Sequence, residues 1–192
     1  MKELSLNILD IVENSVKAKA TLTKILILET GNRLTLRIED NGTGMSKAFL
    51  ESVTDPFTTT RTTRKVGMGL PLLKLEAEQT GGEMTISSVS IDDDPENHGT
   101  EVEAVFYSDH IDFTPLGDVV SSIVTLIQGH PDTDFLFRHE CEKGTVELDT
   151  REIREVLGDE VSLAEYEVIS WIEENLREQY KELNIDLDQQ GG

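Results

Sequence analysis

A pair of alternating segments that runs directly into a glycine-rich loop constrains the fold of this chain most. Residues 24–40 alternate apolar and polar side chains on either side of a Thr-Gly-Asn turn, the pattern of a β-hairpin with one buried face. Asp40 ends the second strand, and residues 41–45 follow as Asn-Gly-Thr-Gly-Met. Glycines at a strand end let a flat ligand approach the backbone. An isolated Asp-x-Gly-x-Gly is also a common turn, so its meaning depends on the segments around it.

The other elements of residues 1–107 complete an alternation of helices and hairpins. Apolar side chains at helical spacing predict a helix over residues 4–19. The order helix, hairpin, helix, helix, hairpin predicts an α/β fold: a mixed sheet covered by helices on one face, in a two-layer sandwich. After the first hairpin, the expected elements are a helix at 47–53, a helix at 70–80 that ends at Gly81-Gly82, and strands at 83–90 and 100–107.

Residues 108–192 differ from residues 1–107 in charge and motifs. The first part holds 11 basic and 17 acidic side chains, a net charge of −6, and the second holds 6 and 21, a net charge of −15. We therefore expect a boundary near Ser108, with an acidic α/β extension of unknown role after it. The extension is predicted to contain a helix at 117–129, a hairpin at 133–150, a helix from 151 and a helix from 162, where Ser-Leu-Ala-Glu matches a capping box.

The composition excludes several classes of function. The 192 residues carry 17 Lys and Arg against 38 Asp and Glu, a net charge of −21, so neither nucleic acid nor an anionic membrane is expected as a partner. The single Cys141 allows no internal disulfide. No apolar stretch is long enough to span a bilayer, and acidic residues interrupt the N-terminal segment, so we expect a cytoplasmic protein.

Two polar segments carry the candidate chemistry. The first predicted helix has a polar stripe opposite its apolar face, which solvent exposure alone would also explain. The stripe consists of Asn7, Asp10, Asn14 and Lys17. Residues 55–69 are rich in hydroxyl groups and cations and lead into Gly67-Met68-Gly69 at a helix start. Backbone N–H groups and the helix dipole favour an anion there, so the segment indicates a polyphosphate site, with a solvated loop as the alternative.

Taken in order, five motifs resemble those of the Bergerat-fold (GHKL) ATP-binding family, which includes gyrase, Hsp-type chaperones, histidine kinases and MutL. Together they extend over about 105 residues of the chain. They are Asp10-Ile-Val-Glu-Asn14, Asp40-Asn-Gly-Thr-Gly44-Met45, Asp55-Pro-Phe57-Thr58-Thr, Gly67-Met68-Gly69-Leu70 and Gly99-Thr100-Glu-Val. The resemblance implies ATP and Mg²⁺ as cofactors.

The same resemblance implies a role for each matching position. Asn14 would hold the Mg²⁺, Asp40 would accept a hydrogen bond from the adenine amino group, and Thr100 would support the same base edge through water. Gly42 and Gly44 would give the base room. Residues of the following lid and helix would cover the nucleotide and meet its phosphates. These are Phe57, Thr58, Arg61, Arg64, Lys65, Gly67, Met68, Gly69 and Leu70, together with Met45 from the glycine loop; Lys74 is equally explained as a solvated helix lysine.

One position departs from the family pattern. Four residues before the motif asparagine, the ATPase and serine-kinase members usually have Glu as a general base, and many histidine kinases have Asn. This chain has Asp10 there. An Asp carboxylate can take a proton from water or from a hydroxyl, but its shorter side chain needs a shifted helix or an intervening water. Asp10 is therefore the candidate catalytic base, and Glu13 is expected to be a surface residue.

The Phe57 and lid motifs are more similar to a histidine-kinase ATP-binding domain than to gyrase or MutL. We therefore expect a stand-alone domain that transfers the γ-phosphoryl group of ATP to a separate protein. An ATPase conformational switch and a non-catalytic ATP sensor remain alternatives, and a homodimer remains open. None of the four histidines lies in the usual acceptor pattern; His98 and His130 are expected in turns, and His110 and His139, which have acidic neighbours, are the candidate acceptors.

Overall fold

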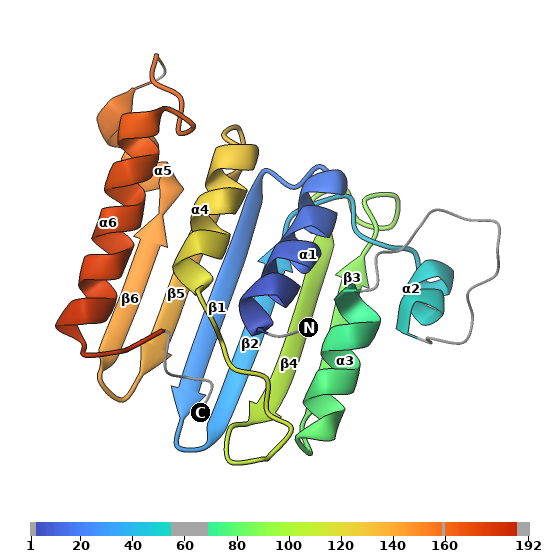
Figure 1. Ribbon diagram of the computed structural model, residues 1–192. Coiled ribbons are helices and arrows are strands. Elements are labelled where there is room, and N and C mark those ends of the chain that lie inside the picture. The colour runs from blue at the N-terminus through green and yellow to red at the C-terminus, as the bar shows by residue number, and fades with distance from the viewer. Residues whose placement is uncertain (1–2, 55–68, 159, 188–192) are drawn as a thin grey trace.

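The computed structural model describes residues 3–54, 69–158 and 160–187, and its six strands form one sheet (Figure 1). The strands are β1 (Leu22–Thr30), β2 (Arg33–Asp40), β3 (Glu83–Val89), β4 (Gly99–Tyr107), β5 (Asp134–Cys141) and β6 (Gly144–Asp149). The helices are α1 (Leu4–Lys17), α2 (Lys47–Thr54), α3 (Gly69–Gln79), α4 (Val119–Gly129), α5 (Thr150–Leu157) and α6 (Tyr166–Glu182).

The sheet is mixed, with the strand order β3-β4-β2-β1-β5-β6. The helices α1, α3, α4 and α6 lie side by side over one of its faces (Figure 1). The expected two-layer α/β architecture with helices on one face is therefore confirmed. Among the helices of the described residues, none is both long and apolar enough to cross a membrane.

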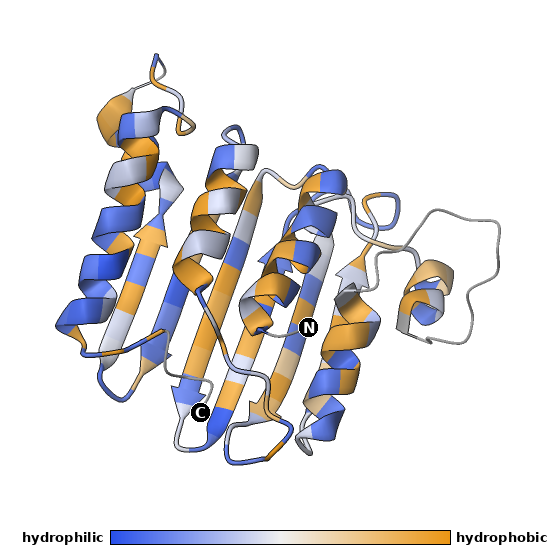
Figure 2. Ribbon diagram, viewed as in Figure 1, coloured by the Kyte–Doolittle hydropathy of each residue, from blue (hydrophilic) through white to orange (hydrophobic). Residues whose placement is uncertain are grey.

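Apolar and polar residues alternate along β1 and β2 (Figure 2), and because successive side chains of a strand point to opposite faces, one face of the hairpin is apolar. Ile25 and Ile27 of β1 are buried under the helices, whereas Lys24 and Glu39 lie on the open face and form an ion pair at 2.9 Å. The register pairs Ile25 with Ile38, so both strands turn their apolar side chains to the same side. Burial of this face against α1 stabilises the sheet at the point where the glycine loop begins.

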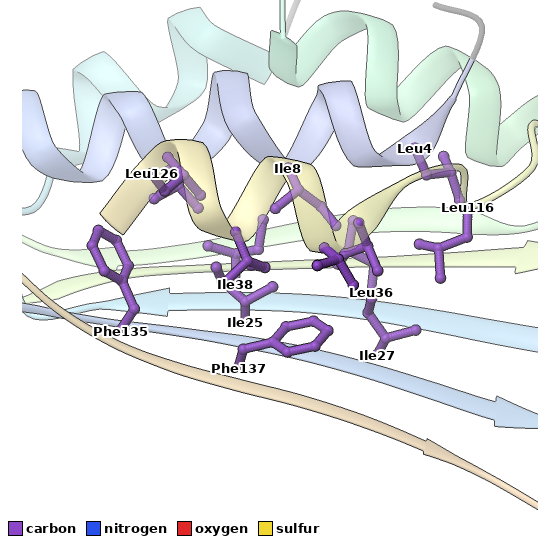
Figure 3. Close-up of a cluster of buried hydrophobic side chains, with 14 of the residues drawn as sticks. Leu4, Ile8, Ile25, Ile27, Leu36, Ile38, Leu116, Leu126, Phe135 and Phe137 are labelled. Carbon is purple, nitrogen blue, oxygen red and sulfur yellow. The ribbon is translucent and has the colours of Figure 1, made fainter. Parts of the chain in front are cut away.

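The second half of the chain extends this same sheet. β5 pairs with β1 in parallel, and α4, which connects the first half to β5, packs against α1. Phe137 of β5 lies beside Ile25, and Phe135 lies near Leu126 of α4, in the same core (Figure 3). Residues on both sides of Ser108 share one sheet and one hydrophobic core. The domain boundary near Ser108 stays a prediction.

The last helix begins later than the sequence pattern predicts. Ser162 does not cap it: the Ser162 hydroxyl accepts a hydrogen bond from the amide of Ala164 at 3.2 Å in a preceding turn, and α6 starts at Tyr166. The turn allows Leu163 to be fully buried in the core, which a helix from Ser162 does not require. The helix packs on the rest of the chain through Ile169, Ile172 and Leu176, whereas Tyr166 in its first turn is 82% exposed.

Candidate functional site

A cavity of about 280 Å³ opens between α1, α2, the start of α3 and the ends of β2 and β4. Its walls are largely apolar, and its polar groups come from segments far apart in the sequence. The apolar side chains include Ile11, Ile38, Val53, Leu70 and Val102, and the polar ones include Asn14, Asp40, Thr43 and Thr100. A mostly apolar cavity with a few convergent polar groups is the usual form of a small-molecule site.

Asp40 is the oriented carboxylate of this cavity. It is the last residue of β2, and its two oxygens accept hydrogen bonds from the Ser15 hydroxyl at 2.7 Å and from the Gly42 amide at 2.8 Å. Ser15 is buried on α1, so the helix and the loop together fix the carboxylate. An ionised carboxylate can accept further hydrogen bonds, and Asp40 therefore offers a fixed acceptor to a ligand.

The glycine loop packs closely against both neighbouring elements. The Thr43 amide donates to the Ala18 carbonyl at 2.8 Å, just after α1 ends. Gly44 has φ +64°, and a Cβ at this position would stand 1.8 Å from the Val89 carbonyl oxygen. A Cβ at Gly42 would come within 2.9 Å of the Ala18 carbonyl. These close approaches explain the glycines through backbone packing, and room for a base at Gly42 and Gly44 stays a prediction.

Three side chains lie in one row across the sheet at the edge of the cavity. The strand register places Asp40 opposite Thr100, and Thr100 opposite Ser88. The Ser88 hydroxyl contacts the Thr100 hydroxyl at 2.8 Å and accepts a hydrogen bond from the Met45 amide at 2.8 Å. Ser15 and Ser88 were missed in the sequence because their roles depend on helix placement and strand pairing.

The four residues of the polar stripe of α1 differ in burial and in the groups that they contact. Asn7 is fully buried, and its amide donates to the Glu76 carboxylate of α3 at 2.5 Å. Asn14 is half-buried and lines the cavity, as does the exposed Lys17. Asp10 is exposed and lies beside the start of α3, where a Cβ on Gly69 would stand 3.0 Å from the Asp10 Cβ. Solvent exposure thus explains only part of the stripe.

Glu13 lies on a different side of α1, as expected. Its carboxylate meets the His130 imidazole at 2.6 Å, so the side chain joins α1 to the end of α4 rather than standing free on the surface. Lys74 forms an ion pair with Glu78 on the same helix at 3.8 Å, which fits the interpretation of Lys74 as a solvated helix lysine.

The predicted phosphate lid falls mainly outside the described residues. This applies to Phe57, Thr58, Arg61, Arg64, Lys65, Gly67 and Met68. The two remaining residues of that motif, Gly69 and Leu70, form the buried first turn of α3, and Leu70 reaches the cavity. Met45 and Thr100 also line the cavity, and their contacts with a nucleotide stay predictions.

The structure overturns one of the two candidate acceptor histidines. His139 is 1% exposed, and its two nitrogens contact the Tyr180 hydroxyl and the Glu29 carboxylate, each at 2.9 Å. A buried, doubly hydrogen-bonded imidazole is closed to a phosphoryl donor, so the proposal of His139 as an acceptor is wrong. Burial raises the pKa of the Tyr180 hydroxyl far above its ordinary value, which keeps it neutral beside Glu29. His110 is exposed, and its role as an acceptor stays a prediction.

His98 lies in the β3–β4 connection, as predicted, and has a structural contact there. It precedes Gly99-Thr100, and its Nδ1 lies 2.5 Å from the Gly42 carbonyl oxygen. Because a carbonyl can only accept, Nδ1 is the donor, and the ring ties the β3–β4 connection to the glycine loop.

The oxygen atoms at the cavity suit a hard cation that is also bound by the phosphates of a ligand. The described residues contain no group of three or more His, Cys, Asp or Glu side chains that could hold a metal. Asn14 provides an amide oxygen at the cavity. Mg²⁺ keeps several waters and is usually bound by one or two protein oxygens together with phosphates. Among the described residues, the site therefore fits Mg²⁺ that is carried by a polyphosphate.

Residues 2–109, more than half of the chain, match the family of histidine kinase-, DNA gyrase B- and HSP90-like ATPases. The chain belongs to this family, and its resemblance to the Bergerat-fold (GHKL) ATP-binding proteins is confirmed. A putative sensor protein of Shewanella frigidimarina (strain NCIMB 400) is 31% identical over 103 residues. That match covers 52% of this chain and 15% of the relative, so the chain spans only a small part of that protein's length.

Solved structures support the same fold. The Aquifex aeolicus MutL ATPase domain complexed with ADP has a TM-score of 0.55 and 20% identity, over 82% of this chain and 69% of that one. The N-terminal domain of a DNA repair protein has a TM-score of 0.51 and 15% identity, over 83% and 58% of the two chains. These alignments cover a larger share of the chain than the family match, so they include part of residues 110–192.

Proposed function

We propose that this chain binds Mg·ATP in the cavity beside Asp40 and transfers the γ-phosphoryl group to a separate protein. The observation that carries the proposal is the fixed Asp40 carboxylate at the edge of an apolar cavity, within the part of the chain that belongs to the ATPase family. The match to a putative sensor protein supports a signalling kinase over other activities of the family.

The base end of the cavity explains the choice of an adenine nucleotide. A purine ring fits between apolar walls such as Ile38 and Val102, and burial of its faces contributes most of the binding free energy. Asp40 accepts a hydrogen bond from the exocyclic amino group. Thr100, opposite Asp40 on β4, supports the same base edge directly or through a water.

The phosphate end lies toward Asn14 and the start of α3. The Asn14 amide oxygen would hold Mg²⁺, which neutralises phosphate charge when bound. The backbone N–H groups at the start of α3 favour an anion. Arg61, Arg64 and Lys65, which lie outside the described residues, are assigned to the lid from the sequence alone. In a chain with a net charge of −21, these cations offset the repulsion that a polyphosphate would otherwise meet.

Asp10 is the general base in this proposal. It lies one helical turn before Asn14, and its exposed carboxylate stands beside Gly69 at the start of α3. This position lets it hold the proton of an acceptor group or of a water molecule. Because the exposed Asp10 carboxylate can also reach water, a second candidate function is an ATPase switch in which lid closure drives association with a partner.

The fate of the γ-phosphate tests the proposal. The full-length protein is incubated with γ-labelled ATP and Mg²⁺, and free phosphate and protein-bound label are followed together, with and without a cell lysate. Asn14→Ala serves as the binding-deficient variant. Asp10→Asn tests the base, and Glu13→Gln is its matched control because it makes the same chemical change on another side of α1.

Acid-labile label on a protein, lost in Asp10→Asn and retained in Glu13→Gln, would support the kinase. Steady release of free phosphate without labelled protein would support the ATPase switch. ATP binding with neither product would refute both activities and leave a nucleotide sensor. Absence of ATP binding would refute the proposal as a whole.

A further inference from the structure

We propose that Asn7 and Glu76 are positioning residues, whose hydrogen bond holds the start of α3 in place against Asp10 and so sets the geometry of the phosphate end of the site. The inference deepens the proposed nucleotide function and rests on it. Asn7 belongs to the polar stripe of α1 but to none of the five motifs, and Glu76 also lies outside them. Neither residue lines the cavity, so each acts through the helix that carries it.

The pair is an uncommon contact for the interior of a helix interface. Asn7 is fully buried and Glu76 is 7% exposed, and the Asn7 amide donates to the Glu76 carboxylate. Within the described part of the chain, the Asn7 Oδ1 atom is buried without a hydrogen-bond partner. A buried carboxylate and an unpaired amide oxygen both cost free energy, and apolar side chains of similar size often replace such a pair with equal or greater stability. The geometry that the pair fixes therefore explains it better than the stability that it adds.

Two contacts between α1 and α3 fix that geometry. Asn7 meets Glu76 in the second half of α3. One turn further along α1, Asp10 lies beside the first residue of α3, where a Cβ on Gly69 would stand 3.0 Å from the Asp10 Cβ. The apolar side chains that the two helices share in the core are non-directional contacts and allow small rotations. A hydrogen bond of defined length and direction does not, so it holds α3 in one orientation.

The orientation of α3 matters most for the terminal phosphate. In the proposed function, backbone N–H groups at the start of α3 meet the phosphates, and Asp10 is the general base. The two groups must keep their relative positions during transfer, because a displacement of about 1 Å can slow a reaction by about 100-fold. ADP has no γ-phosphate, and its base binds at the far end of the cavity. Loss of the pair should therefore affect ATP more than ADP.

The test compares the full-length protein and its variants by calorimetric titration with Mg²⁺ and either ADP or a non-hydrolysable ATP analogue. The rate at which γ-labelled ATP loses its label is measured in parallel. We expect the wild type to favour the analogue by about 10-fold or more, the effect of a hydrogen bond to a charged group. Asn7→Leu combined with Glu76→Met keeps the side-chain volumes and removes the bond. This double variant should show a preference below about threefold and a rate lowered by about 10-fold or more, with an unchanged Kd for ADP and an unchanged or higher Tm.

Two further variants separate positioning from general damage. Asn7→Asp combined with Glu76→Gln exchanges the amide and the carboxylate and keeps one bond between them, so it should restore the preference and the rate. Glu78→Gln makes a carboxylate-to-amide change on the exposed face of α3, where Glu78 pairs with Lys74, and should leave both quantities at wild-type values.

A double variant with the wild-type preference and rate would overturn the inference, as would an equal loss of affinity for both nucleotides. A double variant that does not fold would show that the pair serves stability, and a loss that the exchanged pair does not restore would assign the effect to packing; either result overturns the inference. Equal wild-type affinities for the two nucleotides would overturn it and leave nucleotide binding intact. Binding of neither nucleotide would refute the proposed function itself.

Discussion

Replacement of Asp40 by Asn separates the binding role of this residue from its structural one. In the wild-type protein, the Asp40 carboxylate accepts hydrogen bonds from the Ser15 hydroxyl and from the Gly42 amide. In Asp40→Asn, the amide oxygen can keep the Gly42 bond. The amide nitrogen then faces Ser15, whose hydroxyl can rotate to accept. The hydrogen of the buried Ser15 hydroxyl loses the carboxylate but can turn to a backbone carbonyl one helical turn earlier, so we expect the free energy of unfolding to fall by only about 1 kcal/mol.

The effect on ligand affinity should be larger. The substitution removes the charge and replaces an acceptor with a donor where the base presents its amino group. A hydrogen bond to a charged group contributes about 1.5–3 kcal/mol, which corresponds to about a 10- to 150-fold rise in the Kd for ADP. The result is a variant that remains folded but binds ADP weakly.

Calorimetric titration with ADP and thermal unfolding of the same samples measure both quantities. Glu39→Gln is the matched control, because Glu39 is the neighbouring carboxylate on the opposite face of β2 and pairs with Lys24. We expect this control to bind ADP with unchanged Kd. An Asp40→Asn protein that binds ADP as tightly as the wild type would refute the assignment of the base site. A loss of several kcal/mol of stability would show that the carboxylate is mainly structural.

Three other substitutions test the packing that supports the site. Gly44→Ala should destabilise the protein by more than about 2 kcal/mol in chemical denaturation, because of its positive φ and the clash with the Val89 carbonyl. Tyr180→Phe should cost about 1–3 kcal/mol by leaving His139 Nδ1 without its partner. The raised Tyr180 pKa stabilises the fold below pH 10.0, the group's ordinary value, and this contribution is lost at higher pH, so the variant should lose less stability above that pH than the wild type. Phe137→Ala should cost about 3–5 kcal/mol in one unfolding transition seen by probes in both halves; two separate transitions would contradict a shared core.

Local patterns in the sequence were enough to predict the secondary-structure elements and the motif residues of the first half. Alternation over residues 24–40 predicted the hairpin, and helical spacing predicted α1 to within two residues. Asp40, Asn14 and Thr100 were predicted as site residues because short motifs need particular residue types at fixed spacing, and all three line one cavity. Local patterns carry this information because the periodicity of a strand or helix is a property of the chain segment itself.

Which segments become neighbours in space could be learned from the folded chain alone. Pairing of β5 with β1 joins the acidic half to the sheet, and no local pattern encodes which strands become neighbours. The same holds for Ser88, whose hydroxyl meets that of Thr100 because the β3–β4 register sets the two residues opposite each other. His139, a candidate acceptor from the sequence, is buried in the folded chain and links β5 to α6 through its hydrogen bond with Tyr180. Each of these outcomes depends on contacts between residues distant in sequence, which composition and spacing do not specify.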